Sequence, residues 1–347
     1  MDNCLYRECD FDNKKIKKKA RKAVNAVALA YLISSVLTYA FSILFALILP
    51  LFSKLVSFVL SLQGSSPMYI KAYVENFFLS EEFNWFIAIV STIICSFLPF
   101  AFISSKIFNL DWNEVVPVKG KIIKHLPFVY CACLMMSGLA SGVAGGLFSF
   151  MFPDAYSKSS VEVVEVYGTS STGYSLVLSF LAMCIVAPFV EEFIYRGVMF
   201  RYFRKFGFAF AAFSSSLIFG LGHPTVEQIA YAFVCGLVLC YVTEKTGNIK
   251  SAVIIHFINN FIGYVSAYIL PLFGTENILL IFDTVYGLVV GVFAVIGMIV
   301  LFKNKTDVTD KNISGEQTQT APLTSFFGIG AVFVIVLAVM NILLGLV

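Results

Sequence analysis

The stretch APFVEEFIYRG, residues 187–197, places Glu191, Glu192 and Arg196 inside a long apolar segment. Charged side chains inside membrane spans are energetically costly, rare, and usually functional. The surrounding segment, residues 175–204, is long enough to cross a bilayer, since about 20 apolar residues suffice for a helical span. The stretch therefore predicts a membrane helix that carries part of a functional site.

The composition predicts that the rest of the chain is also embedded in a membrane. Of its 347 residues, 59% are hydrophobic and 13% are charged, with a mean hydropathy of +0.87. An ordinary soluble domain has about 25% charged residues. We therefore expect an all-α, polytopic membrane helix bundle of about nine transmembrane helices, with its core in the fourth to seventh. The apolar runs cover residues 26–52, 85–105, 126–152, 175–204, 207–223, 226–243, 250–270, 278–302 and 324–347.

A basic cluster precedes the first apolar run and predicts the orientation of the chain. Its members are Lys14, Lys15, Lys17, Lys18, Lys19, Arg21 and Lys22. Positive charge concentrates on the cytoplasmic side of membrane proteins, so we expect a cytoplasmic N-terminus in a bacterial plasma membrane. The net charge of +3 is small, and the cluster indicates contact with the lipid bilayer and no nucleic acid partner.

The connecting segments divide the chain further. We expect a basic cytoplasmic segment (1–25), N-terminal transmembrane helices (26–174), a catalytic core (175–270), an eighth helix (271–302), a linker (303–323) and a C-terminal helix (324–347). Residues 61–84 and 153–174 are polar and rich in serine, which predicts two outer loops. Most of the eight cysteines lie in apolar segments, so a disulfide framework is not expected.

Further polar residues lie in two other apolar segments of the predicted core. His223 follows Phe219 in the stretch FGLGHP, and His256 precedes Asn260 in HFINN. Helical residues four apart share a face, so each of these pairs is predicted to lie together.

The same rule separates the roles of the two glutamates. Glu192 and Arg196 are four apart and are predicted to form an ion pair. Glu191 is turned about 100° away from Glu192 on the helix and is free to face another group.

The depth of these residues can be compared from helix geometry. Glu191 and His223 each lie 16 residues from Gly207, which corresponds to a rise of about 24 Å. His256 and Asn260 rise only about 9 and 15 Å from Lys250 by the same measure. The three segments are therefore predicted to present their polar residues at comparable depth, with a difference that tilt and side-chain length absorb.

This set of side chains suits hydrolytic chemistry. Glu191 can accept a proton from water as a general base, and His223 can help to position that water. His256 and Asn260 can donate hydrogen bonds to a developing oxyanion. Each polar residue taken singly also fits a structural role, as a tie between helices, but three clusters at comparable depth favour a site.

At these residues the sequence resembles the CAAX prenyl protease type II and bacteriocin-processing family, also called CPBP or Abi, of intramembrane proteases. The two glutamates with arginine four residues after the second match Glu191, Glu192 and Arg196. The second motif matches Phe219 and His223, and the third matches His256 and Asn260. The resemblance implies a peptidase with Glu191 activating water, with His223, His256 and Asn260 as further catalytic residues, and with Glu192, Arg196 and Phe219 in support.

The resemblance leaves the chemistry of the nucleophile open between a glutamate protease and a metalloprotease. Glu191, His223 and His256 are the candidate ligands for zinc. Their spacing differs from the His-Glu-x-x-His of zinc proteases, and a glutamate can activate water without a metal. We therefore expect metal-independent chemistry, with zinc as the alternative.

The expected partner is a membrane-associated peptide or protein substrate, in bacterial-type peptide processing or bacteriocin self-immunity. An alternative is a catalytically silent membrane protein that binds a peptide as an immunity or scaffold factor. Another is a proton-coupled transporter that uses the buried acids and histidines as a relay. The chain lacks the internal repeat typical of such transporters, which disfavours this alternative.

Overall fold

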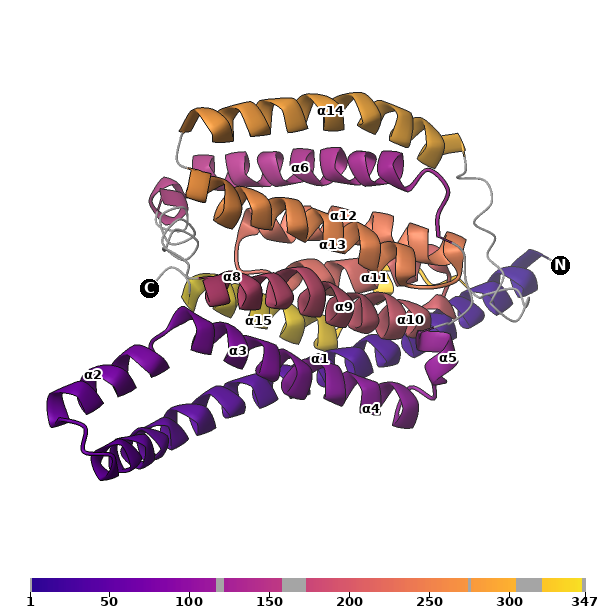
Figure 1. Cartoon of the computed structure of the whole chain (residues 1–347). Helices are drawn as coiled ribbons and strands as arrows, with labels where there is room; N and C mark the ends of the chain where they lie inside the picture. The colour runs from indigo at the N-terminus through magenta and orange to yellow at the C-terminus, as the bar shows by residue number, and fades with distance from the viewer. Residues whose placement is uncertain (1, 117–121, 158–172, 274–275, 304–319, 345–347) are drawn as a thin grey trace.

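The computed structural model describes residues 2–116, 122–157, 173–273, 276–303 and 320–344. Within these ranges all regular secondary structure is helical and no strand occurs (Figure 1). The predicted fold class, an all-α polytopic bundle, is confirmed. The division of the chain into six segments stays a prediction.

The described helices follow one another along the chain in three parts. The first part comprises α1 (Asp2–Leu62), α2 (Pro67–Phe78), α3 (Glu81–Ser91), η1 (Thr92–Phe97), α4 (Leu98–Lys106), α5 (Trp112–Val115) and α6 (Leu126–Met151). The second part comprises α8 (Gly173–Phe180), η2 (Leu181–Val186), α9 (Ala187–Glu192), η3 (Phe193–Phe200), α10 (Arg201–Arg204), α11 (Phe208–Leu221) and α12 (Val226–Thr246). The last part comprises α13 (Lys250–Tyr264), η4 (Val265–Ile269), η5 (Leu270–Phe273), α14 (Glu276–Lys303), η7 (Leu323–Ser325) and α15 (Ile329–Leu344).

Each predicted apolar run falls on a helix. In the described part of the chain, seven helical segments are long and apolar enough to cross a membrane. The other two predicted runs coincide with shorter apolar helices, Phe208–Leu221 and Ile329–Met340. The count of nine membrane spans therefore stays a prediction.

The predicted outer loop at residues 61–84 is wrong, because this region is mostly helical. Helix α1 continues to Leu62, and α2 and α3 follow almost directly. The serines that suggested a loop are helix caps: the hydroxyls of Ser66 and Ser80 accept hydrogen bonds from the backbone N–H groups of Tyr69 and Phe83. The second predicted loop and the predicted linker lie mostly outside the described residues.

The bundle is arranged around α12. Helix α6 packs between α14 and α12, while α12 also packs on α11, and α1 packs against α15 (Figure 1). The second half of α1 and helix α2 project away from this body (Figure 1). The segment α8–α10 thus lies beside α11 and α13, so residues 192–197 are buried in the bundle while Phe189 is exposed.

Two glycines allow α11 and α12 to approach closely. A Cβ atom on Gly220 would lie 2.8 Å from the carbonyl oxygen of Ile229, and one on Gly236 would lie 2.8 Å from Cβ of Ser216. Small residues at such positions let helices in membranes pack backbone to backbone. This close packing sets the position of Phe219 and His223 relative to the helix that carries Arg196.

Candidate active site

The helical segment that carries the two glutamates contains an irregular turn directly before them. Pro188 has no N–H group, and the N–H of Ala187 bonds to the carbonyl of Ala182 in the π-helical turn. The carbonyl of Met183 is thus left without a backbone donor. The side chain of Asn260 supplies one, since its Nδ2 lies 2.8 Å from this oxygen.

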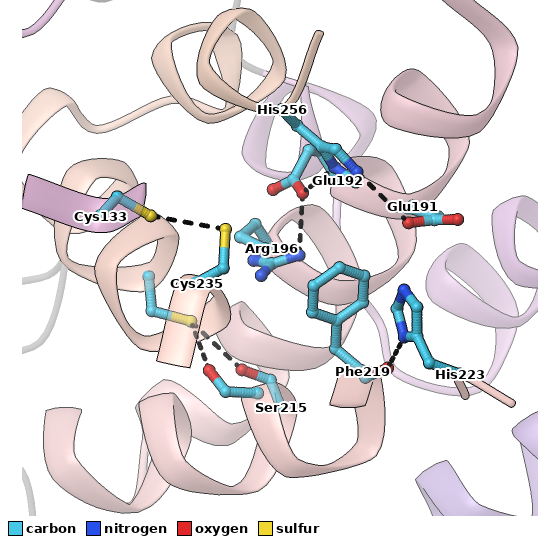
Figure 2. A network of polar contacts seen from close by, with 11 residues as sticks. Cys133, Glu191, Glu192, Arg196, Ser215, Phe219, His223, Cys235 and His256 are labelled. Carbon is cyan, nitrogen blue, oxygen red and sulfur yellow. Dashed lines mark hydrogen bonds and ion pairs between the residues drawn. The ribbon is translucent and has the colours of Figure 1, made fainter. Parts of the chain in front are cut away.

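Glu192 and Arg196 form the predicted ion pair. Their Oε1 and Nη1 atoms are 2.8 Å apart, and both side chains are fully buried. The same Oε1 lies 2.9 Å from Nδ1 of His256 (Figure 2). Because a carboxylate only accepts, Nδ1 of His256 donates, and Glu192 holds both the arginine and the imidazole in place.

Glu191 lies in different surroundings from its neighbour. Its side chain is 34% exposed, and its Oε2 lies 3.7 Å from Nε2 of His256 (Figure 2). The Nδ1 hydrogen bond to Glu192 is what turns Nε2 toward Glu191. The sequence prediction that Glu191 is turned away from the ion pair, and free to face another group, agrees with this geometry.

The ring of Phe219 packs against the guanidinium of Arg196 and against both imidazole rings. Its centroid lies 4.4 Å from Cζ of Arg196, 5.1 Å from the ring of His223 and 5.9 Å from the ring of His256. Nδ1 of His223 lies 3.1 Å from the carbonyl oxygen of Phe219, so this nitrogen donates and Nε2 is left open. Figure 2 shows His223 and Glu191 on the same side of the cluster.

His256 lies close to Glu191, although helix geometry predicted a smaller depth for His256 than for Glu191. In the turn between α12 and α13, Asn248 and Ile249 are buried and Gly247 is exposed, and Nη2 of Arg201 donates to the carbonyl of Gly247 at 3.0 Å. Arg201 lies six residues before Gly207, which corresponds to about 9 Å along a helix. The start of α13 therefore lies beside Arg201 and not beside the turn after α10, and His256 contacts both glutamates.

Asn260 occupies a different place from the one predicted for an oxyanion donor. Its Nδ2 donates to Met183, and its Oδ1 accepts from Nδ2 of Asn259 at 3.2 Å. Asn259 in turn accepts from the hydroxyl of Tyr231 at 2.5 Å. One N–H of the Asn260 amide remains available, but the side chain is held primarily as a tie between α13 and η2.

Two tyrosines complete the site and were missed by the sequence reasoning. The hydroxyls of Tyr31 on α1 and Tyr195 on η3 interact beside Gly222, where a Cβ atom would lie 3.2 and 3.4 Å from them. The charge of Glu191 acts on both phenols. Tyr195 lies within the quoted stretch, so its helical spacing from Glu191 could have indicated it, whereas Tyr31 lies in an apolar run with no local signal.

Zinc binding by the candidate ligands Glu191, His223 and His256 stays a prediction. Within the described ranges, no three His, Cys, Asp or Glu side chains lie together in a way that could hold a metal ion. One nitrogen of His256 is engaged by Glu192 and one nitrogen of His223 by a backbone carbonyl. The arrangement therefore brings together Glu191, Glu192, Arg196, Phe219, His223 and His256 as a hydrogen-bonded and aromatic cluster.

Fold and site together define a helical membrane protein with a polar cluster in the core of its bundle. Residues 173–262 match the model of the family described as type II CAAX prenyl endopeptidase Rce1-like. The match covers 90 of the 347 residues, about a quarter of the chain, and includes all three motifs. Comparisons with curated proteins and with solved structures gave no match.

The chain therefore carries a segment of the Rce1-like, CAAX-protease type at residues 173–262, as its three motifs predicted. It is therefore a peptidase and an integral membrane protein. The family indicates a membrane-associated peptide as the general class of substrate.

Proposed function

We propose that the chain hydrolyses a peptide bond of a membrane-associated peptide or protein with a water molecule that Glu191 activates. The observation that carries this proposal is the contrast between the two glutamates. Glu192 is buried and engaged by Arg196 and His256, while Glu191 is partly exposed beside Nε2 of His256. A partly exposed carboxylate next to an oriented imidazole suits general-base catalysis.

The reaction proceeds in two steps. The water oxygen attacks the carbonyl carbon of the scissile bond while its proton passes to Oε2 of Glu191. The tetrahedral intermediate then collapses, the C–N bond breaks, and the proton moves to the leaving amine. Nε2 of His256 and Nε2 of His223 lie on the side of Glu191. Because Nδ1 carries the proton in both rings, each Nε2 can accept a hydrogen bond from the water, and it can donate to the oxyanion only when the imidazole is protonated at both nitrogens.

The remaining residues of the cluster position Glu191 and His256. The Glu192–Arg196 ion pair fixes His256, and Phe219 packs against both imidazoles and the guanidinium. Asn260 acts through η2, because it satisfies the carbonyl of Met183 that Pro188 leaves open about two turns before Glu191. The proposed chemistry uses no metal ion, and zinc held by Glu191, His223 and His256 is the alternative.

The substrate is processed in a bacterial plasma membrane, as a peptide that is matured or inactivated there, with the N-terminus of the enzyme in the cytoplasm. Bacteriocin self-immunity is one such role. A catalytically silent immunity or scaffold protein that binds a peptide is the alternative. That alternative has no use for a second, partly exposed carboxylate next to an oriented imidazole.

Quantitative mass spectrometry of membranes that carry wild type or Glu191→Ala tests the proposal. We expect peptide products that are present with wild type and absent with the variant, at equal protein levels. Equal peptide profiles in the two samples would favour the silent binding protein.

A further inference from the structure

A second polar site lies at the other end of the same helical segment, far along the chain from Glu191. Lys19 and Lys22 of α1 and Lys205, directly after α10, line a cavity of about 430 Å³. Lys19 and Lys22 are three residues apart and share a helix face. All three charged residues that line this cavity, here named the basic pocket, are positive.

The floor of the basic pocket is apolar and aromatic. It is formed by Ile16, Ala23, Tyr202 and Phe206. The Nζ atom of Lys205 lies 3.8 Å from the ring centroid of Tyr202 and 5.4 Å from that of Phe206. The two rings hold the amine against the wall of the pocket, and the partial burial lowers the pKa of Lys205.

The C-terminal end of α10 does not repel an anion that binds in the basic pocket. Helix C-termini carry exposed carbonyls that repel negative charge. Here the carbonyls of Phe203 and Arg204 accept from Phe206 and Gly207, and that of Phe206 accepts from the N–H of Ala321. The field in the pocket is therefore dominated by the three lysines.

The basic pocket lies where the apolar helices end. The span Gly173–Arg204 stops one residue before Lys205, and the basic cluster of α1 directly precedes its apolar run. This is the level of lipid headgroups, where anionic phosphates meet basic side chains. A phosphate requires positive charge, and the glycerol and upper acyl chain require the apolar floor.

We propose that the basic pocket binds the phosphate of one anionic phospholipid headgroup, which bridges α1 and the turn after α10. The bound lipid fixes residues 16–23 of α1 beside the end of the helical segment that contains α9, η3 and α10. Bridging by the lipid requires no catalytic step and is independent of the proposed peptidase chemistry.

Native mass spectrometry of the full-length protein in detergent tests this proposal, with short-chain phosphatidylglycerol and phosphatidylcholine as probes. We expect one phosphatidylglycerol to bind in preference to phosphatidylcholine. Lys19→Gln/Lys22→Gln/Lys205→Gln should weaken this binding about 100-fold, since each lysine contributes to headgroup binding. Binding of both lipids with equal affinity would overturn the proposal.

A control variant separates the pocket from general positive charge. Lys124→Gln/Lys245→Gln/Lys303→Gln removes the same charge from the same predicted side of the membrane, on or next to helices that do not line the pocket. At 0.15 M salt such distant charges are largely screened, so we expect affinity to fall less than about threefold. An equal loss in both triple variants would show that the pocket has no special role.

Two further measurements cover the remaining outcomes. If the triple pocket variant does not fold, Lys19→Gln and Lys22→Gln alone, both at exposed side chains, should each weaken binding about fivefold. No loss in either would contradict the proposal. Inorganic phosphate at millimolar concentration should not displace the lipid, and displacement would assign the pocket to a free phosphate instead.

Discussion

At the residue scale, Glu191 and Glu192 are adjacent in the chain but lie in opposite surroundings. Glu192 is fully buried, and its Oε1 contacts both Arg196 and His256. Glu191 is 34% exposed, and its Oε2 lies 3.7 Å from the far nitrogen of the same imidazole. One carboxylate therefore stabilises the arrangement while its neighbour is open to a substrate.

This difference predicts that replacing glutamate by glutamine lowers the free energy of unfolding strongly at position 192 and hardly at position 191. Glu192→Gln leaves the guanidinium of Arg196 buried without a counter-charge, which costs about 3–5 kcal/mol of unfolding free energy. Glu191→Gln removes a partly exposed charge and should change this free energy by less than about 0.5 kcal/mol. Denaturant unfolding of both purified variants in detergent measures the difference, and equal stability of the two would contradict the assignment.

The sequence predicted the residues of the cluster well because helix periodicity governs them. The ion pair follows from a spacing of four residues, and the separation of Glu191 follows from the 100° turn per residue. Tyr31 and the engagement of Asn260 could not be predicted in this way. Both depend on which helices become neighbours, and on a carbonyl that is free only because Pro188 follows a π-helical turn.

At the element scale, Asn260 ties α13 to η2 by satisfying one backbone carbonyl. Asn260→Ala leaves the carbonyl of Met183 without a donor, which should cost about 1–3 kcal/mol of unfolding free energy. Pro188→Ala supplies a backbone N–H at the position of the missing donor. In that background the loss from Asn260→Ala should be smaller, and a double-mutant cycle on unfolding free energies measures this coupling.

Strict additivity of the two changes would contradict the role given to Asn260. Asn259→Ala serves as the matched control, because Asn259 bonds to Asn260 and Tyr231 but not to Met183. Its effect should not depend on the residue at position 188.

The close contact between α11 and α12 predicts that a larger residue at Gly220 destabilises the protein. Gly220→Ala places a Cβ atom 2.8 Å from a backbone carbonyl, which cannot move as a side chain can. We expect a loss of about 1–3 kcal/mol and a lower midpoint of thermal unfolding. Gly287→Ala in α14 is the control, since no heavy atom lies within 4 Å of its added Cβ. Equal midpoints for the two variants would show that α11 and α12 do not require the glycine.

The sequence located every apolar helix but misjudged the region between α1 and α3. Serine-rich composition indicated a loop, whereas Ser66 before Pro67 and Ser80 before two glutamates are helix-start signals. Position relative to the following residues therefore carries more information here than composition does.

At the scale of the whole molecule, charge distribution predicts the orientation in the membrane. The N-terminal part of α1, helix α10 and the end of α14 lie at one end of the bundle (Figure 1), and all three carry basic residues. A reporter enzyme that is active only outside the cytoplasm should be active when fused after Ser80 and inactive when fused after Lys106. The reverse pattern would invert the orientation and place the basic pocket in the outer leaflet.

The central claim is that Glu191 activates the water that cleaves the substrate. The most direct test is the rate of product formation by purified Glu191→Gln in bilayers, with a substrate identified from the membrane peptide profiles. We predict a loss of about 100- to 10,000-fold relative to wild type, with an unchanged midpoint of thermal unfolding. Turnover of Glu191→Gln at the wild-type rate would contradict the claim.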